Sequence, residues 1–342
     1  MKRIGRVDLR IDKGEIHMAG IEAAVDEVRL YGALKEDRID PLVLTVKTNG
    51  STLEISGNVG SLFSDPLLDI ALQGEISLPE IQEILRVKTE LTGVVKTSLT
   101  MRGSVNNPDV TLLLGYGGGN LAGNRIDGMD LSCHLEDRYL TIEPLSLYAP
   151  LGRLDLRGDV NLRKAFSQGF LSSQRNLDAI AYKLSLRQRG TSLENILRGG
   201  TEVTGAIHSK MTVEGQGIFP ETLSAKVVVD LIAEKLAVSQ ILSLADVRVE
   251  TQIGLAHGRV TIEDMKAQTG KTWLKLAGNY DFSSQELVAT VKLESPDLAE
   301  IFRDVEAEDF LDKDLYQGKV SGRVTLMGKR TSLLGTLALQ GK

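Results

Sequence analysis

Few residues of this chain have the types and the spacing that metal binding or nucleophilic catalysis requires. Cys133 and His134 are neighbours, but adjacent residues of a strand point to opposite faces, so we do not expect a Cys-His catalytic pair. Cys133 shares its face with Leu131 and Leu135, which predicts a small apolar residue in a core. The histidines match no ligand spacing such as H-E-x-x-H; they are His17, His134, His208 and His257.

Two further segments resemble ligand-binding loops only superficially. The glycine-rich stretch 115–120 lacks the G-K-[ST] ending of a phosphate loop and the third glycine of G-x-G-x-x-G, so it predicts a turn. The acidic run 306–314 does not fit the D-x-[DN]-x-[DN]-G calcium loop. We therefore predict no catalytic residue, no metal ligand and no cofactor, and we do not expect an enzyme.

The composition of the 342 residues excludes several classes of partner. Charged residues make up 25% of the chain and the formal net charge is -6, so no strong basic field indicates nucleic acid. Aromatic residues at 4% argue against base-stacking platforms. The 34 glycines against 8 prolines favour tight turns over proline-rich disorder. The single cysteine rules out an internal disulfide.

The residues that recur with a clear spacing are apolar ones that alternate with polar ones, as in half-buried strands. Lys and Glu side chains occupy the other parity, which predicts a sheet that is wet on one side only. The predicted apolar row is the candidate binding surface of this chain. Its members are Leu30, Leu42, Leu44, Leu53, Ile55, Leu68, Ile70, Leu72, Leu99, Met101, Leu131, Leu135, Leu154, Leu156, Leu184, Leu186, Val247, Val249, Leu274, Leu276, Val291, Leu293, Val324 and Leu326.

The strands that carry this row repeat along the chain. Three stretches, 52–59, 152–160 and 272–280, alternate Leu or Ile with polar or small residues, and each predicts a strand that ends in a Gly-Asn or Gly-Asp turn. Their landmark glycines, about 101 and 120 residues apart, are Gly57, Gly158 and Gly278. We expect one repeat array over 1–342, with approximate periods 4–110, 111–223 and 224–334, and we expect it to continue beyond both ends in a longer parent protein.

Each period also contains a short helical signal. Residues 78–85 place Pro79 near the start and Glu80 in the first turn, which predicts an amphipathic helix. Equivalent signals lie at 192–197 and 295–302. The polar stretch 164–176 and the acidic stretch 304–314 interrupt the pattern and predict solvated insertions.

The apolar row of such an array must be covered in some way. About 21 strands at about 4.8 Å each would extend on the order of 100 Å, and open sheets beyond about 10 strands tend to curl. One short helix per period offers little cover. The sheet must close on itself, pack on a partner, or leave a groove lined by the row. The sequence contains no secretory signal, and no run approaches the roughly 18 apolar residues of a spanning helix.

The order of strand, glycine, short turn with proline, and strand at 92–108 resembles the AsmA/TamB family of envelope proteins. The stretches 139–147 and 151–160 resemble it too. The resemblance implies an all-β, elongated, curled β-groove with one short helix per period of about 110 residues. It implies a periplasmic location, an inner-membrane anchor in the full-length protein, and an outer-membrane barrel protein of the assembly family as its partner. Members are held to conduct phospholipid between the membranes, or to assist assembly of outer-membrane proteins.

The expected function is therefore that of a segment of a bridge-like lipid-transfer protein, with phospholipid acyl chains bound along the apolar row. Two alternatives remain open at this point. One is a factor for outer-membrane protein assembly or translocation, which would use the same groove. The other is a closed β-repeat scaffold whose apolar rows fill one another and hold no lipid. A polysaccharide-cleaving β-helix would need clustered carboxylates, and no such cluster stands out.

Overall fold

The computed structural model describes residues 4–18, 21–86, 88–150, 152–192, 203–238, 242–296, 318–329 and 332–341. Contacts divide the chain into two compact units. Unit 1 comprises Met1–Pro150 and Asp155–Asn176, and unit 2 comprises Leu151–Leu154 and Leu177–Lys342. Each unit is described by itself below. The three predicted periods do not correspond to these two units and stay a prediction.

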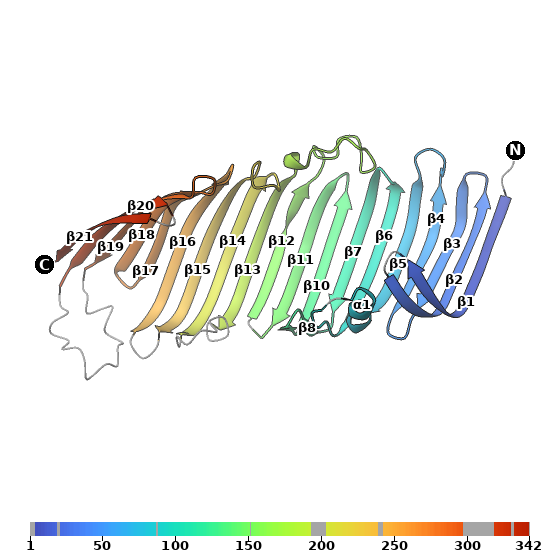
Figure 1. The fold of residues 1–342 in the computed structure, drawn as a ribbon, viewed down its shortest axis with the longest axis horizontal. Helices are drawn as coiled ribbons and strands as arrows, with labels where there is room; N and C mark the ends of the chain where they lie inside the picture. Colours follow the sequence, from blue (N-terminus) through green and yellow to red (C-terminus); the bar gives the residue numbers. More distant parts are fainter. Residues whose placement is uncertain are drawn as a thin grey trace. The chain divides into compact units, whose positions relative to one another are not determined.

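The chain is all-β, as predicted. Nineteen strands belong to a long antiparallel sheet that is not closed into a barrel, and two further short strands form a separate ribbon (Figure 1). This excludes a closed barrel as the way in which the apolar rows would be covered.

Unit 1 is an antiparallel meander in which each strand pairs with the next along the chain. The exception is the step from β7 to β10, which pair directly although the β8–β9 ribbon separates them in sequence. Its strands are β1 (Ile4–Met18), β2 (Ile21–Lys35), β3 (Arg38–Lys47), β4 (Thr52–Gly60), β5 (Leu67–Ser77), β6 (Val94–Ser104), β7 (Asn107–Tyr116), β8 (Gly119–Leu121), β9 (Asn124–Ile126), β10 (Gly128–Glu136) and β11 (Tyr139–Ala149). Strand β12 (Gly152–Asn161) follows, and the unit boundary falls within it.

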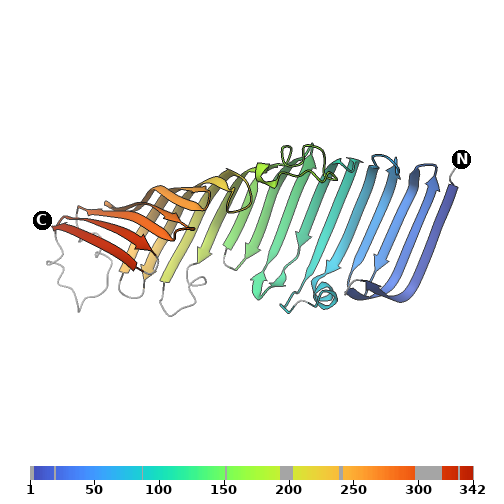
Figure 2. The same cartoon turned by 45° about the horizontal axis from the view of Figure 1, so that its top comes forward.

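Unit 2 is a meander of the same kind, in which each strand pairs antiparallel with its successor. Its strands are β13 (Ala181–Ser192), β14 (Val203–Gln216), β15 (Ser224–Val238), β16 (Leu242–Ala256), β17 (Arg259–Thr269), β18 (Thr272–Asp281), β19 (Glu286–Ser295), β20 (Val320–Lys329) and β21 (Ser332–Gly341), preceded by the 3-10 turn η1 (Leu177–Ala179). The strand direction rotates steadily from β13 to β21, as Figure 2 shows, and this is the ordinary twist of a β-sheet.

The helix predicted at 78–85 is confirmed as α1 (Leu78–Ile84). Proline occupies its first turn, and the Glu80 carboxylate accepts hydrogen bonds from the hydroxyls of Thr48 (2.8 Å) and Ser51. These bonds tie α1 to the turn between β3 and β4. Ser192 and Ser295, the first residues of the helices predicted at 192–197 and 295–302, are the last residues of strands. Residues 193–197 and 297–302 lie outside the described residues, as does the acidic stretch 304–314.

The predicted turns at the landmark glycines are wrong. Gly57, Gly158 and Gly278 lie inside β4, β12 and β18, and each strand continues past its glycine. Gly57 has a φ of 147°, and a Cβ placed there would lie 2.0 Å from the carbonyl oxygen of Asp69 on β5. A Cβ on Gly278 would likewise lie 2.6 Å from the carbonyl oxygen of Val288 on β19. Gly57 and Gly278 mark close backbone approaches within the sheet, which a local Gly-Asn pattern cannot distinguish from a turn.

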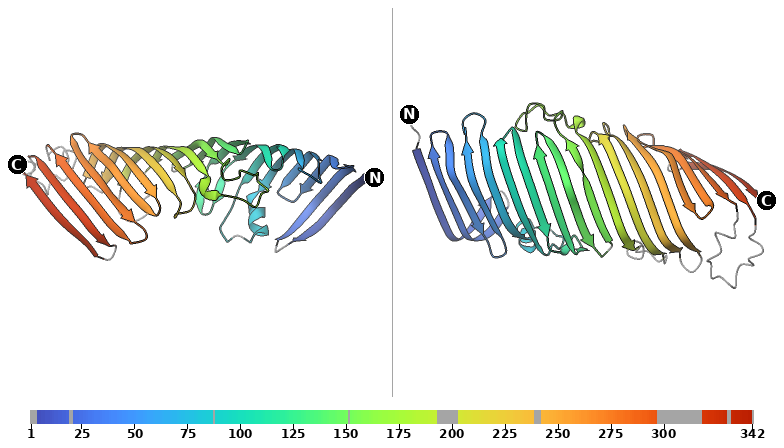
Figure 3. Two further views of the ribbon diagram at one scale, coloured as in Figure 1. Left: turned by 90° about the horizontal axis from the view of Figure 1, so that it is seen from above. Right: turned by 180° about the vertical axis from the view of Figure 1, so that it is seen from behind.

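Within each unit the strands form a single layer (Figure 3). Among the described residues the buried apolar side chains are few, and four of the seven are alanines: Val25, Tyr116, Ala165, Ile180, Ala225, Ala233 and Ala289. In the described part of the chain, neither unit therefore has the thick apolar core of a two-layer domain.

Candidate functional site

A continuous apolar row crosses unit 1 at right angles to its strands. Directly opposed residues of an antiparallel pair share one face of the sheet, so the pairing register identifies the members of the row. From β1 to β11 they are Leu9, Leu30, Leu44, Ile55, Leu72, Leu99, Leu112, Cys133 and Ile142. Nine successive strands thus contribute an apolar side chain to one line, which we call the central row.

Two flanking rows widen this face in unit 1. On one side the register aligns Val28, Val46, Leu53, Gly74, Thr97, Leu114 and Leu131. On the other side it aligns Leu42, Gly57, Ile70, Met101, Val110, Leu135 and Leu140. Leu68 lies one row further out, opposite Val59. The predicted binding residues of this part of the chain therefore share one apolar face.

Strand β12 presents Leu154 and Leu156 to the same face, as two hydrogen bonds indicate. The Ser146 hydroxyl donates to the Asp155 carboxylate at 2.7 Å, and the Thr141 hydroxyl donates to the Asp159 carboxylate at 3.1 Å. Ser146 and Thr141 belong to the polar face of β11, so Asp155 and Asp159 do as well. Because side chains alternate, the leucines between them point the other way.

Unit 2 carries an equivalent apolar face of its own. One row runs Leu186, Met211, Val229, Thr251, Met265, Leu276, Val291, Val324 and Leu337. Another runs Leu184, Val213, Val227, Ile253, Ile262, Gly278, Ala289 and Leu326. A third contains Val249, Leu274 and Leu293, with Ala267 between the first two, and Val247 lies beside Ala233 on the same face. The predicted residues of this unit again share one side.

All 24 predicted side chains are half-buried, and none reaches the burial of a core residue. In the described part of the chain the strands of each unit form one layer (Figure 3), so neighbours in the same sheet supply much of this partial cover. Full burial of a Leu or Ile side chain contributes about 1.5–3 kcal/mol to stability. Because these side chains are only half-buried, the fold gains only part of that free energy. Each unit therefore exposes an apolar surface that a ligand or partner can cover.

The opposite face is polar and is stabilised by ion pairs across neighbouring strands. Lys96 pairs with Glu75 at 2.9 Å, and Lys183 pairs with Glu214 at 3.7 Å. Shallow hollows lie on this face around Gly115 in unit 1 and Gly254 in unit 2. The two faces thus differ in chemistry, as the alternation predicts.

Several apolar residues of these rows are missing from the sequence prediction. Leu112 and Leu114 belong to the face, whereas Leu113 between them lies on the polar side and is 49% exposed. Val227 and Val229 flank the outward-facing Val228 in the same way. Continuous apolar runs carry no alternation, so only the register of the neighbouring strands identifies which of their members face inward.

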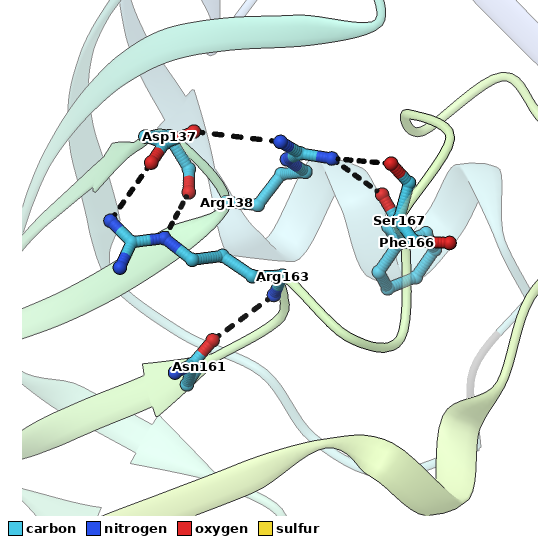
Figure 4. Close-up of polar contacts among 6 residues, drawn as sticks. All are labelled: Asp137, Arg138, Asn161, Arg163, Phe166 and Ser167. Atoms are coloured by element: carbon cyan, nitrogen blue, oxygen red, sulfur yellow. Dashed lines mark hydrogen bonds and ion pairs between the residues drawn. The ribbon is translucent and has the colours of Figure 1, made fainter.

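One rim of unit 1 is covered by the segment 162–176, which contains the stretch 164–176 that the sequence predicts to be a solvated insertion. Arg138 donates from Nη1 to the carbonyl oxygens of Phe166 and Ser167, both at 2.9 Å (Figure 4). Arg163 donates from Nε to the carbonyl oxygen of Asp137 at 3.0 Å and forms an ion pair with its carboxylate at 2.9 Å. The segment also buries Ala165 to 1% exposure. We call this segment the rim brace. Its backbone is held at these points, while most of its residues are exposed, as expected of a solvated insertion.

The rim brace extends from the end of β12 to the turn between β6 and β7. There the amide of Phe170 donates to the carbonyl oxygen of Asn106 at 3.1 Å, and the amide of Leu171 donates to the Asn106 side chain at 3.3 Å. Asn106 in turn donates to Asp65 at 3.2 Å. The brace therefore links the tips of several hairpins and fixes one border of the apolar face.

The titratable groups on the apolar faces carry no sign of catalytic chemistry. Burial raises the pKa of the Cys133 thiol and also that of the Tyr182 phenol, so both stay protonated at neutral pH. His134 accompanies Thr111 and Asp109 on the polar face, away from Cys133. Among the described residues, no three His, Cys, Asp or Glu side chains are placed to hold a metal ion.

None of the described helices is long and apolar enough to cross a bilayer. Comparison with protein-family models, with curated proteins and with solved structures finds no match.

Proposed function

We propose that this chain is a segment of a bridge-like lipid-transfer protein and that its apolar faces conduct phospholipid acyl chains between the inner and outer membranes. The observation that carries the proposal is the unbroken central row, which crosses nine strands of unit 1 with side chains of which none is fully buried. The resemblance to the AsmA/TamB family supports the same function and a periplasmic location. The outer-membrane barrel partner of the full-length protein belongs to this proposal as well.

The energetics of lipid transfer explain why such a surface is useful. Burial of a methylene contributes about 0.8 kcal/mol, so moving a 16-carbon acyl chain from an apolar environment into water costs roughly 13 kcal/mol of transfer free energy. A row in which each strand offers the next apolar side chain at about 4.8 Å lets an acyl chain advance without leaving apolar contact. The headgroup stays in water at the border of the face. The binding free energy depends on the length of the acyl chain and not on specific polar contacts. The face therefore binds lipids as a class.

Native mass spectrometry with lipid extraction tests the proposal on the chain purified from cells that export it. Leu99→Asp and Leu276→Asp each place a carboxylate in an apolar row, one in each unit. Ser98→Asp and Ala277→Asp introduce the same charge one residue away, on the polar face, and serve as matched controls. Phospholipid should co-purify with the wild type and both controls and should be lost from the Leu99 and Leu276 variants.

Circular dichroism of the same variants separates lipid binding from folding. If Leu99→Asp unfolds the chain, the central row is ordinary core. If the folded wild type carries no lipid, the proposal fails, and a protein-binding role for the apolar faces becomes the better explanation.

A further inference from the structure

The polar face of unit 2 contains a row of four cations, none of which forms an ion pair with a described carboxylate. Lys266, Lys275, Lys292 and Arg323 come from β17, β18, β19 and β20, and each is directly opposite the next. At about 4.8 Å between strands, the four positions cover about 14 Å. We call them the basic row. Like charges placed directly opposite each other repel, so this row produces a concentrated positive field.

Within the basic row, Lys266 is also opposite Glu250 on β16, whereas Lys275 and Lys292 have cations opposite them on both sides. Other cations of the polar faces form ion pairs with the carboxylates opposite them. Lys96 is opposite Glu75, Arg102 is opposite Asp69 at 3.4 Å, and the pair in unit 2 is Lys183 and Glu214. Within the described residues, no carboxylate forms an ion pair with a member of the basic row. Lys275 instead lies over the ring of Trp273, with 5.3 Å between Nζ and the ring centroid. The positive charge of the basic row is therefore available to an external anion.

A second row on the same polar face is apolar and exposed. Val288, Met327 and Leu334 are directly opposite one another on β19, β20 and β21, with exposures of 41%, 53% and 80%. Val288 is four residues from Lys292 along β19, so the two rows run parallel about 13 Å apart. We call these residues the outer apolar row. A line of exposed apolar side chains does not stabilise a surface that faces water, and such patches mark interaction sites.

We propose that this face of unit 2 docks onto an anionic phospholipid bilayer. The basic row would lie against the lipid phosphates, and the outer apolar row would enter the boundary between headgroups and acyl chains. Trp273 beside Lys275 adds a ring of the type that is enriched at membrane interfaces. This inference concerns the face opposite the proposed lipid-conducting one, and it stands whether or not that face carries acyl chains.

The net charge of -6 does not oppose this docking at physiological salt. Screening there limits interactions between exposed charges to about 8 Å, so the membrane responds to the charges nearest to it. Each Lys or Arg held at an anionic surface increases the binding constant about fivefold.

Flotation of the 342-residue chain with vesicles tests the proposal. Vesicles with 30% phosphatidylglycerol in phosphatidylcholine should bind the chain, and vesicles of phosphatidylcholine alone should bind it far more weakly. The double variant K275Q K292Q should lower the binding constant about 25-fold. The control K96Q K183Q changes the net charge equally but alters cations that have carboxylate partners, and it should bind like the wild type.

A variant of the outer apolar row tests the apolar part. At raised salt, where the electrostatic contribution is screened, Met327→Gln should bind anionic vesicles more weakly than the wild type. The decrease in vesicle binding that salt itself causes should be the same in both proteins. The proposal is overturned if the wild type does not float with anionic vesicles or if the two double variants lose binding equally.

Discussion

Gly57 of β4 and Asp69 of β5 come so close that no side chain fits between them: a Cβ on Gly57 would lie 2.0 Å from the Asp69 carbonyl oxygen. Gly57 also has a φ of 147°, which side-chain-bearing residues rarely adopt. Its position falls in a flanking row of the apolar face, opposite Ile70. The glycine therefore permits the close approach of the two strands beneath the candidate binding surface.

Replacement of this glycine should be costly. Gly57→Ala should lower the free energy of unfolding by about 2 kcal/mol or more, because the sheet must separate locally and the backbone is strained. Gly60→Ala is a matched control in the same strand, since its Cβ would meet its nearest neighbour, Leu67, at 3.9 Å. Urea denaturation should show the control within about 0.5 kcal/mol of the wild type. Equal effects for both variants would contradict the close-approach argument.

The positions that the sequence predicts correctly are those where the pattern is local. Alternation identifies Leu30, Leu44 and Leu99 as members of one face, and the proline and Glu80 identify α1. Gly57 and Leu112 are different, because a close backbone approach within a strand and the facing of a continuous apolar run depend on neighbouring strands. The hydrogen bonds of the rim brace could not be predicted for a related reason. Its polar composition predicts a solvated loop, and most of its residues are exposed, but its hydrogen bonds reach residues far away in sequence, such as Asn106.

Cys133, a member of the central row, offers a direct probe of that row. Burial raises the pKa of its thiol, so the reactive thiolate is scarcer at neutral pH than in an exposed cysteine. Alkylation by iodoacetamide at pH 7.4 should therefore be several-fold slower than in the urea-unfolded chain. Added phospholipid should slow it further if acyl chains cover the row.

A control on the other face isolates the lipid effect. The double variant C133S S132C moves the thiol to the polar face, because Ser132 is the neighbouring strand residue. Lipid should leave its alkylation rate unchanged. Protection of both thiols by lipid, or of neither, would count against acyl chains on the central row.

The rim brace depends on Arg138, whose guanidinium joins two backbone carbonyls of the segment 162–176. Arg138→Ala should lower the free energy of unfolding by about 1–3 kcal/mol, because the carbonyl oxygens of Phe166 and Ser167 lose a charged donor. Limited proteolysis should then cut within 162–176. Arg157→Ala, which removes an exposed arginine from β12, should leave the cleavage pattern unchanged. A brace that stays resistant without Arg138 would show that Ala165 and the Asn106 contacts suffice.

Asp281 should make the stability of unit 2 sensitive to acid. Its carboxylate accepts hydrogen bonds from the Ser283 hydroxyl, from the Ser284 amide and from Arg259, which hold its pKa well below the usual range. A carboxyl group with a lowered pKa in the folded state contributes its full stability above the unfolded pKa of about 3.9, and loses it as pH falls toward the folded value.

Asp281→Asn should therefore destabilise the chain at pH 5–7, and its difference from the wild type should shrink progressively below about pH 4. Urea denaturation at a series of pH values measures that difference. The matched control is Asp264→Asn, which changes an exposed carboxylate of the neighbouring strand β17 and should have a small effect throughout. A difference for Asp281→Asn that grows on acidification would have the wrong sign, because the lowered pKa requires the wild-type carboxylate to lose its advantage as it takes up a proton. If the difference in the free energy of unfolding between the wild type and Asp281→Asn stays constant down to pH 2, the charge of Asp281 does not contribute to stability. The turn at Ser283 and Ser284 would then depend only on hydrogen bonds that do not require a charged carboxylate.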